Sequence, residues 1–91
     1  MLSAMKKTKP SLSAREIFGQ NLRRARRLKE ISQEELAFRA DISRTYLSEV
    51  ERGGRNISID NMEALALALE ISLGDLINPD LFASVTDRLQ D

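Results

Sequence analysis

Residues 32–53, with the sequence SQEELAFRADISRTYLSEVERG, predict two short helices joined by a tight turn. The first helix is expected over about residues 33–40 and the second over about 44–52, since apolar residues recur there at helical spacing. These apolar residues are spaced to meet in one small core: Leu36, Ala37, Ala40, Ile42, Leu47 and Val50. The polar side chains of the second helix then project outward from a rigid support.

Serine residues mark the predicted helix starts. Ser32 can cap the first of these two helices, with Glu35 completing a capping box, and Ser43 can cap the second. Ser13 and Glu16 repeat the capping-box pattern at the start of an earlier helix. The apolar stripe expected on that helix is Ile17, Phe18, Leu22, Ala25 and Leu28. Its other faces carry basic residues expected to meet solvent or phosphate: Arg23, Arg24, Arg26, Arg27 and Lys29.

The remainder of the chain also has helical periodicity. Helices are expected over residues 59–70 and 73–77, capped by Ser58 and Ser72, and the tail DLFASVTDRLQD predicts a further helix to the C-terminus. Both prolines lie near the ends of the chain, so nothing interrupts the pattern between them. The fold class is therefore all-α. Residues 1–12 lack periodicity and are expected to form a flexible N-terminal arm before one domain over residues 13–91.

Charge is segregated along the 91 residues although the net charge is zero. Residues 1–55 hold thirteen Lys and Arg against seven acids, giving +6, and residues 56–91 hold one Arg against seven acids, giving −6. A local basic patch can bind nucleic acid even when the total charge is neutral. The alternative is that these charges merely solvate surface helices.

The composition narrows the chemistry. There is no cysteine and no histidine, so thiolate chemistry, a histidine base and a conventional zinc site are excluded. We expect no enzyme activity and no cofactor. No apolar run is long enough for a signal peptide or a membrane span, and the expected location is the cytoplasm.

The segments SQEELA, ISRTYLSEVERG and LALALEISLGDLI resemble the Cro/repressor-type, or XRE, family of helix-turn-helix regulators, over about residues 17–77. RTYLSEVERGGRNISI is most similar to the controller proteins of restriction–modification systems. The resemblance implies a compact five-helix, lambda-repressor-like fold, with the helix-turn-helix at about 32–53. Asp41 stands in the turn where the family often has Gly, and aspartate tolerates the left-handed backbone expected there better than most residues.

The resemblance implies that the helix over 44–52 enters the major groove of DNA. Gln33, at a helix start, would meet a phosphate, and Arg44 could form a bidentate pair with guanine. Arg52 and Arg55 would fix the register on the DNA backbone. The full set of candidate DNA-binding residues is Gln33, Ser43, Arg44, Thr45, Tyr46, Ser48, Arg52, Arg55 and Asn56. Glu49 and Glu51, on or beside this helix, should avoid phosphates, and Glu49 is expected to position Arg52 or another arginine.

One such helix reads only a few base pairs, so these domains pair and read two half-sites about 34 Å apart. The acidic C-terminal helices, about residues 59–91, are the expected dimerisation region. Its candidate interface residues are Leu67, Leu73, Ile77, Leu81 and Phe82. A monomer whose final helix folds back on its own core is the alternative.

The sequence thus predicts a homodimeric, sequence-specific transcriptional regulator, with double-stranded DNA as partner and neither a membrane nor a small-molecule ligand. RNA polymerase is a further candidate partner, because the sign of regulation would depend on operator placement. The alternatives are the antitoxin of a toxin–antitoxin pair and an interaction adaptor that keeps the fold without binding DNA.

Overall fold

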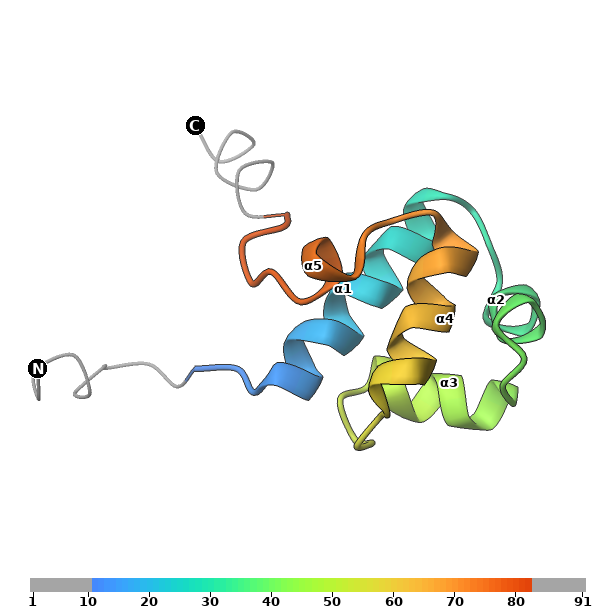
Figure 1. Ribbon diagram of the computed structural model, residues 1–91, viewed down its shortest axis with the longest axis horizontal. Coiled ribbons are helices and arrows are strands. Elements are labelled where there is room, and N and C mark those ends of the chain that lie inside the picture. Colours follow the sequence, from blue (N-terminus) through green and yellow to red (C-terminus); the bar gives the residue numbers. More distant parts are fainter. Residues whose placement is uncertain (1–10, 83–91) are drawn as a thin grey trace, which may run out of the picture.

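The computed structural model describes residues 11–82, and this part of the chain is all-α, as predicted. Its helices are α1 (Ala14–Leu28), α2 (Gln33–Ala40), α3 (Arg44–Glu51), α4 (Ile59–Leu69) and α5 (Leu73–Leu76), arranged as in Figure 1. None of these described helices is long and apolar enough to cross a membrane. The expected arm over residues 1–12 and the final helix to residue 91 lie almost entirely outside the described residues.

Every one of these five helices begins after a serine whose hydroxyl accepts a hydrogen bond from the backbone N–H three residues ahead. At α1 the capping box is complete, because the backbone N–H of Ser13 donates to the Glu16 carboxylate at 2.8 Å. The box expected at Ser32 forms only in half. The carboxylate of Glu35 instead accepts a hydrogen bond from Arg39 one turn ahead, at 2.8 Å.

The ends of the helices use left-handed residues, as expected at Asp41 (φ 60°) and also at Gly53 (φ 76°), which follows α3 closely. Glu30 and Glu70 adopt the same conformation after α1 and α4, at φ 57° and 59°. The turn after Asp41 leads within two residues to the cap of α3. This tight turn sets the angle between α2 and α3.

The core lies where α2 packs on α3 and α4 and where α1 packs on α3 and α5. Its fully buried side chains come from all five helices and include Phe18, Leu22, Leu36, Leu47, Val50, Leu65, Leu69 and Leu76. The expected helix-turn-helix core is confirmed, with Ile42 partly buried against it. Leu28 was wrongly assigned to the core and is 73% exposed, since it lies on the last turn of α1 beside a shallow hollow that Ile71 and Leu81 also line.

Two residues of α1 fix its position in the fold. Gly19 crosses α3 so closely that a Cβ atom there would lie 2.3 Å from the carbonyl oxygen of Val50. Buried Asn21 donates two hydrogen bonds, to the carbonyls of Leu76 at 3.0 Å and Asn78 at 2.9 Å. These contacts hold α1 against both α3 and the end of α5.

Candidate nucleic-acid interface

The outward face of α3 carries the predicted reading residues. Because Leu47 and Val50 are buried, the helix turns Arg44 and Thr45 to solvent at its N-terminal end. Ser48 follows one turn later and is half-buried. Arg52 caps the C-terminal end of α3, and its Nη1 donates to the Ser48 hydroxyl at 2.6 Å.

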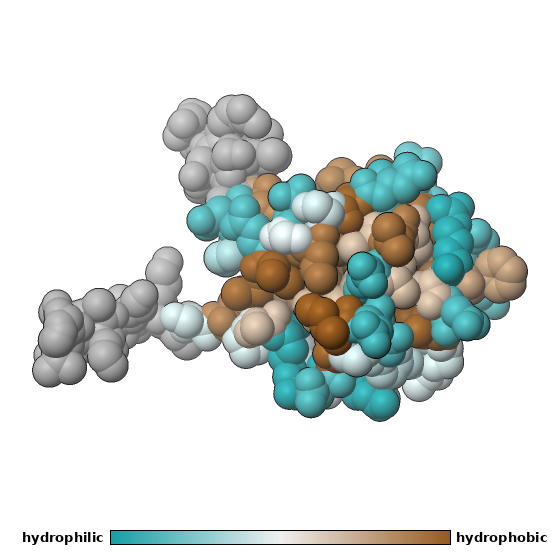
Figure 2. Space-filling model, viewed as in Figure 1, coloured by the Kyte–Doolittle hydropathy of each residue, from teal (hydrophilic) through white to brown (hydrophobic). Residues whose placement is uncertain are grey.

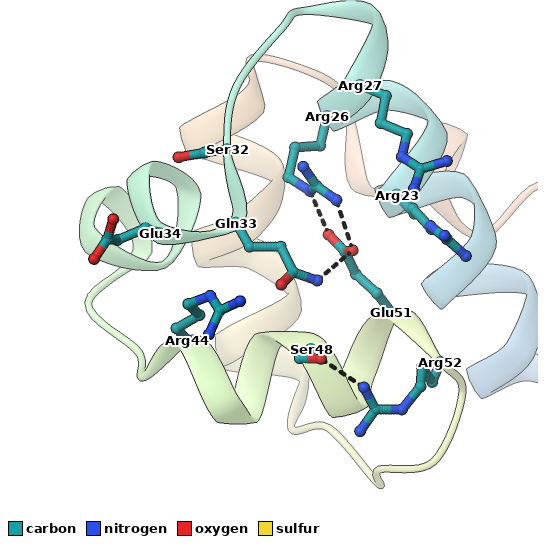
Figure 3. A pocket seen from close by; sticks show the side chains of 10 residues that line it. All are labelled: Arg23, Arg26, Arg27, Ser32, Gln33, Glu34, Arg44, Ser48, Glu51 and Arg52. Carbon is teal, nitrogen blue, oxygen red and sulfur yellow. Dashed lines mark hydrogen bonds and ion pairs between the residues drawn. The ribbon is translucent and has the colours of Figure 1, made fainter.

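A hollow of about 580 Å³ lies beside this face, between α1, the start of α2 and α3. We call it the arginine groove. Figure 3 shows the side chains that line it: Arg23, Arg26, Arg27, Ser32, Gln33, Glu34, Arg44, Ser48, Glu51 and Arg52. Five arginines against two glutamates make it basic. A concave surface lined by guanidinium groups attracts phosphate through charge and multiple N–H donors.

A buried ion pair lies at the base of the arginine groove. Glu51, the last residue of α3, is 4% exposed, and its carboxylate accepts two hydrogen bonds from Arg26 of α1, at 2.7 and 3.0 Å. Arg26 also donates to the carbonyl of Ile31 at 2.9 Å. The expectation that Arg26 meets solvent or phosphate was wrong, because its guanidinium pairs with the buried Glu51 carboxylate inside the fold.

Gln33 is anchored by the same carboxylate. Its Nε2 donates to Glu51 Oε1 at 3.0 Å, so one side chain at the end of α3 orients the first residue of α2. Figure 3 shows Gln33 and Arg44 on the same side of the arginine groove. The free backbone N–H groups at the start of α2 add partial positive charge there.

A second hollow, of about 350 Å³, borders α3 next to Thr45 and Ser43. We call it the tyrosine groove. Half-buried Tyr46 accepts a hydrogen bond from Asn61 Nδ2 at 3.3 Å, and the Arg55 guanidinium carbon lies 4.8 Å from the centre of its ring. Arg55 also donates to Glu49 at 2.7 Å. Glu49 therefore positions an arginine, as expected, and that arginine is Arg55.

The candidate DNA-binding residues thus fall into two adjacent grooves, with one exception. Gln33, Arg44, Ser48 and Arg52 line the arginine groove, and Ser43, Thr45, Tyr46 and Arg55 line the tyrosine groove. Asn56 lines a separate hollow with Arg15, Ile57 and Ile77, at the start of α1. It follows Arg55 in the loop after α3 but lines neither of the two grooves.

The candidate dimer residues divide by exposure. Leu67 on α4 and Ile77 after α5 are 72% and 45% exposed, whereas Leu73, Leu81 and Phe82 are half-buried. Leu73 and Phe82 pack against the core. The guanidinium carbon of Arg24 lies 5.8 Å from the centre of the Phe82 ring. Figure 2 shows apolar surface over α4 and α5. Of the candidate dimer residues, Leu67 and Ile77 are therefore the two that are exposed.

The burial of the Arg26–Glu51 pair could have been predicted from the spacing of these residues in the sequence. Each residue stands four positions after a leucine of the core, Leu22 in one case and Leu47 in the other. Residues four apart share a helix face, so a charge at each position lies on the buried side. Opposite charges at two such positions predict a buried pair.

The helix α3 begins directly after a tight turn. It presents arginine and hydroxyl groups beside a basic groove, which is the geometry of the recognition helix in a helix-turn-helix. Comparison with protein families matches residues 22–76 to the helix-turn-helix family. The chain belongs to this family of DNA-binding transcriptional regulators.

The chain is similar to controller proteins and to other transcriptional regulators. Control protein C.BamHI of Bacillus amyloliquefaciens is 48% identical over 63 residues, which cover 68% of this chain and 78% of that protein. The crystal structure of the restriction–modification controller protein C.AhdI from Aeromonas hydrophila is 47% identical, with a TM-score of 0.66 over 68% of this chain and 94% of that one. SinR, a master regulator for biofilm formation solved in complex with DNA, is 34% identical, with a TM-score of 0.64 over 67% and 98%.

Proposed function

We propose that this chain acts as a homodimer that reads two operator half-sites through α3, as a controller of restriction–modification genes. One observation supports this proposal most directly. Arg44, Thr45 and Ser48 project from one face of a helix held rigidly by core packing and the Arg26–Glu51 pair. Similarity to C.BamHI and C.AhdI supports the controller assignment.

Within this proposal the grooves have distinct roles. Arg44 reads a base, since its five N–H donors suit the O6 and N7 atoms of guanine. Arg23, Arg27 and Arg52 line the arginine groove and contact phosphates, which fixes the register. Gln33, held by Glu51, meets a phosphate at the start of α2.

The dimer follows from the small reach of one helix. With eight residues, α3 reads only a few base pairs, so two copies are needed for a useful site. Leu67 and Ile77 supply exposed apolar surface on α4 and after α5, outside both grooves. Joining the copies through this surface leaves both α3 helices accessible.

The test is a salt titration of binding to the duplex upstream of the chain's own gene and to a random duplex. We expect the wild type to prefer the upstream duplex. Arg44→Ala should lose about five- to 150-fold of that preference, corresponding to about 1–3 kcal/mol for a bidentate base contact. Arg39→Ala is the charge-matched control, because Arg39 pairs with Glu35 and lines neither groove.

Each outcome of this titration either supports or contradicts the proposal. Arg39→Ala should weaken both complexes by a similar small factor, through charge alone. Equal binding of the wild type to both duplexes would refute the proposal of sequence reading. An unchanged preference in Arg44→Ala would move base recognition to other residues.

A further inference from the structure

Arg55 lies on the loop between α3 and α4, and α3 holds its guanidinium from two sides. Nη1 donates to Glu49 Oε1 at 2.7 Å, and the guanidinium carbon lies 4.8 Å from the ring centre of Tyr46. The backbone closes the same loop, since the N–H of Gly54 donates to the carbonyl of Glu49 at 3.0 Å. Arg55 is therefore placed and partly neutralised before any ligand arrives.

This arrangement faces the presumed DNA. Glu49, Tyr46 and Arg55 line the tyrosine groove together with Thr45, so a duplex read by Thr45 lies against the pair. The side chains of Arg55 and Glu49 remain 49% and 35% exposed. An ion pair this accessible is weak enough for a phosphate to compete for the guanidinium.

Such an exchange has an electrostatic consequence. If Arg55 turns to a phosphate, the Glu49 carboxylate is left unpaired beside a polyanion, which opposes binding. The exchange becomes favourable where the duplex offers Glu49 a donor of its own, such as the cytosine amino group in the major groove. The pair therefore responds differently to different sequences.

We propose that Glu49 is a specificity-determining residue that acts through Arg55, withholding this guanidinium from the phosphates of arbitrary DNA and releasing it at the operator. The inference rests on the proposed reading of DNA by α3. It predicts that removing the Glu49 charge strengthens binding to random duplex more than binding to the operator.

The experiment is a double-mutant cycle of Glu49→Gln and Arg55→Ala, measured on random duplex and on the upstream duplex over a range of salt. On random duplex, Glu49→Gln should bind more tightly by a factor between about 1.4 and about five, the range of an exposed ion pair. The slope of log K against log salt should steepen by about 0.9, which corresponds to one more phosphate neutralised. On the upstream duplex the gain should be smaller, so the sequence preference falls.

Glu70→Gln is the matched control, because it removes one negative charge at the end of α4 away from α3 (Figure 1). In the Arg55→Ala background, Glu49→Gln only relieves repulsion between this carboxylate and the phosphates, so its gain should be smaller than in the wild type, although it can exceed that of the distant Glu70→Gln. An equal gain with and without Arg55 would mean simple charge repulsion and would overturn the proposal, as would no gain at all on random duplex.

Failure of the proposed function gives a different result. In that case the wild type shows no preference for the upstream duplex, while the Glu49–Arg55 coupling on random duplex stays measurable. Thermal unfolding of each variant checks the fold.

Discussion

Glu51 and Arg26 form a two-hydrogen-bond ion pair that joins the end of α3 to α1 inside the protein. Their side chains are only 2% and 10% exposed, respectively, so both charges are largely withdrawn from solvent. Gln33 donates to the same carboxylate. The relative positions of three helices thus depend on one acidic side chain.

Replacing Glu51 with Gln should destabilise the domain by about 3–5 kcal/mol, because the buried Arg26 charge loses its counter-charge. Urea unfolding followed by helical circular dichroism measures the change. Glu35→Gln is the control, since it removes one member of the exposed Glu35–Arg39 pair and should cost at most about 1 kcal/mol. Equal losses in the two variants would contradict this account of Glu51.

The double variant Arg26→Met, Glu51→Leu tests the same point from the other side. Replacing both charges with apolar groups removes the unpaired charge as well as the pair, so most of the stability should return. A loss as large as that of Glu51→Gln alone would mean that packing dominates over charge at this position.

Gly19→Ala should destabilise the domain by about 1–3 kcal/mol, although alanine favours helices over glycine. The added Cβ would lie 2.3 Å from the Val50 carbonyl oxygen, and the backbones of α1 and α3 would have to separate. Gly74→Ala in α5 is the control, because the nearest atom to its added Cβ is 4.0 Å away. The urea midpoint should fall only for the first variant, and a rise there would contradict the close crossing.

Acid should weaken the start of α1. The backbone N–H of Ser13, with a smaller contribution from its hydroxyl, lowers the pKa of Glu16 below the ordinary value of 4.5. A lowered folded-state pKa means that the stabilisation is present above the ordinary value and is lost as pH falls through the lowered one. The gap in Tm between the wild type and Glu16→Gln should therefore be positive at pH 7 and shrink at pH 3. A gap that is constant across this range would show that the charge of Glu16 does not contribute.

Leu67→Glu should weaken self-association by at least about ten-fold, as expected for a central apolar contact, while leaving the unfolding midpoint nearly unchanged. Leu67 is 72% exposed on α4, so the core does not depend on it. Sedimentation measures the oligomer, with Phe38→Glu on α2 as the control at another exposed apolar residue. A Leu67→Glu variant that associates as strongly as the wild type would contradict this choice of interface.

Much of the fold could be predicted because its signals are local. Each helix start is marked by a serine, and the helix-turn-helix core follows the spacing of apolar residues. The left-handed turn at Asp41 was also predictable, since it depends only on the backbone preference of one residue. The outward face of α3 then follows from which of its residues are buried.

What could not be predicted depends on contacts between helices. The close crossing at Gly19 and the two hydrogen bonds of Asn21 join residues far apart in sequence, and nothing at either position marks the partner. Leu28 has the right spacing for the core, but it lies on the last turn of α1, where packing ends. Glu35 has the capping-box position, but Arg39 competes for its carboxylate.

The same limit applies to the candidate site. Arg44 and Thr45 could be placed from the motif alone. The hollow that Asn56 borders with Arg15 could not, because it depends on how the loop after α3 packs beside the start of α1.

The left-handed residues at the ends of α1 and α4 open a route for protein engineering. Glu30 and Glu70 both hold a backbone conformation that asparagine and glycine adopt with less strain, and both are exposed and outside the arginine and tyrosine grooves. Substitutions at these two positions can raise the melting temperature of the domain without changing any candidate DNA-binding residue. A thermostable carrier of this kind would let the side chains of α3 be exchanged freely in a search for new target sequences.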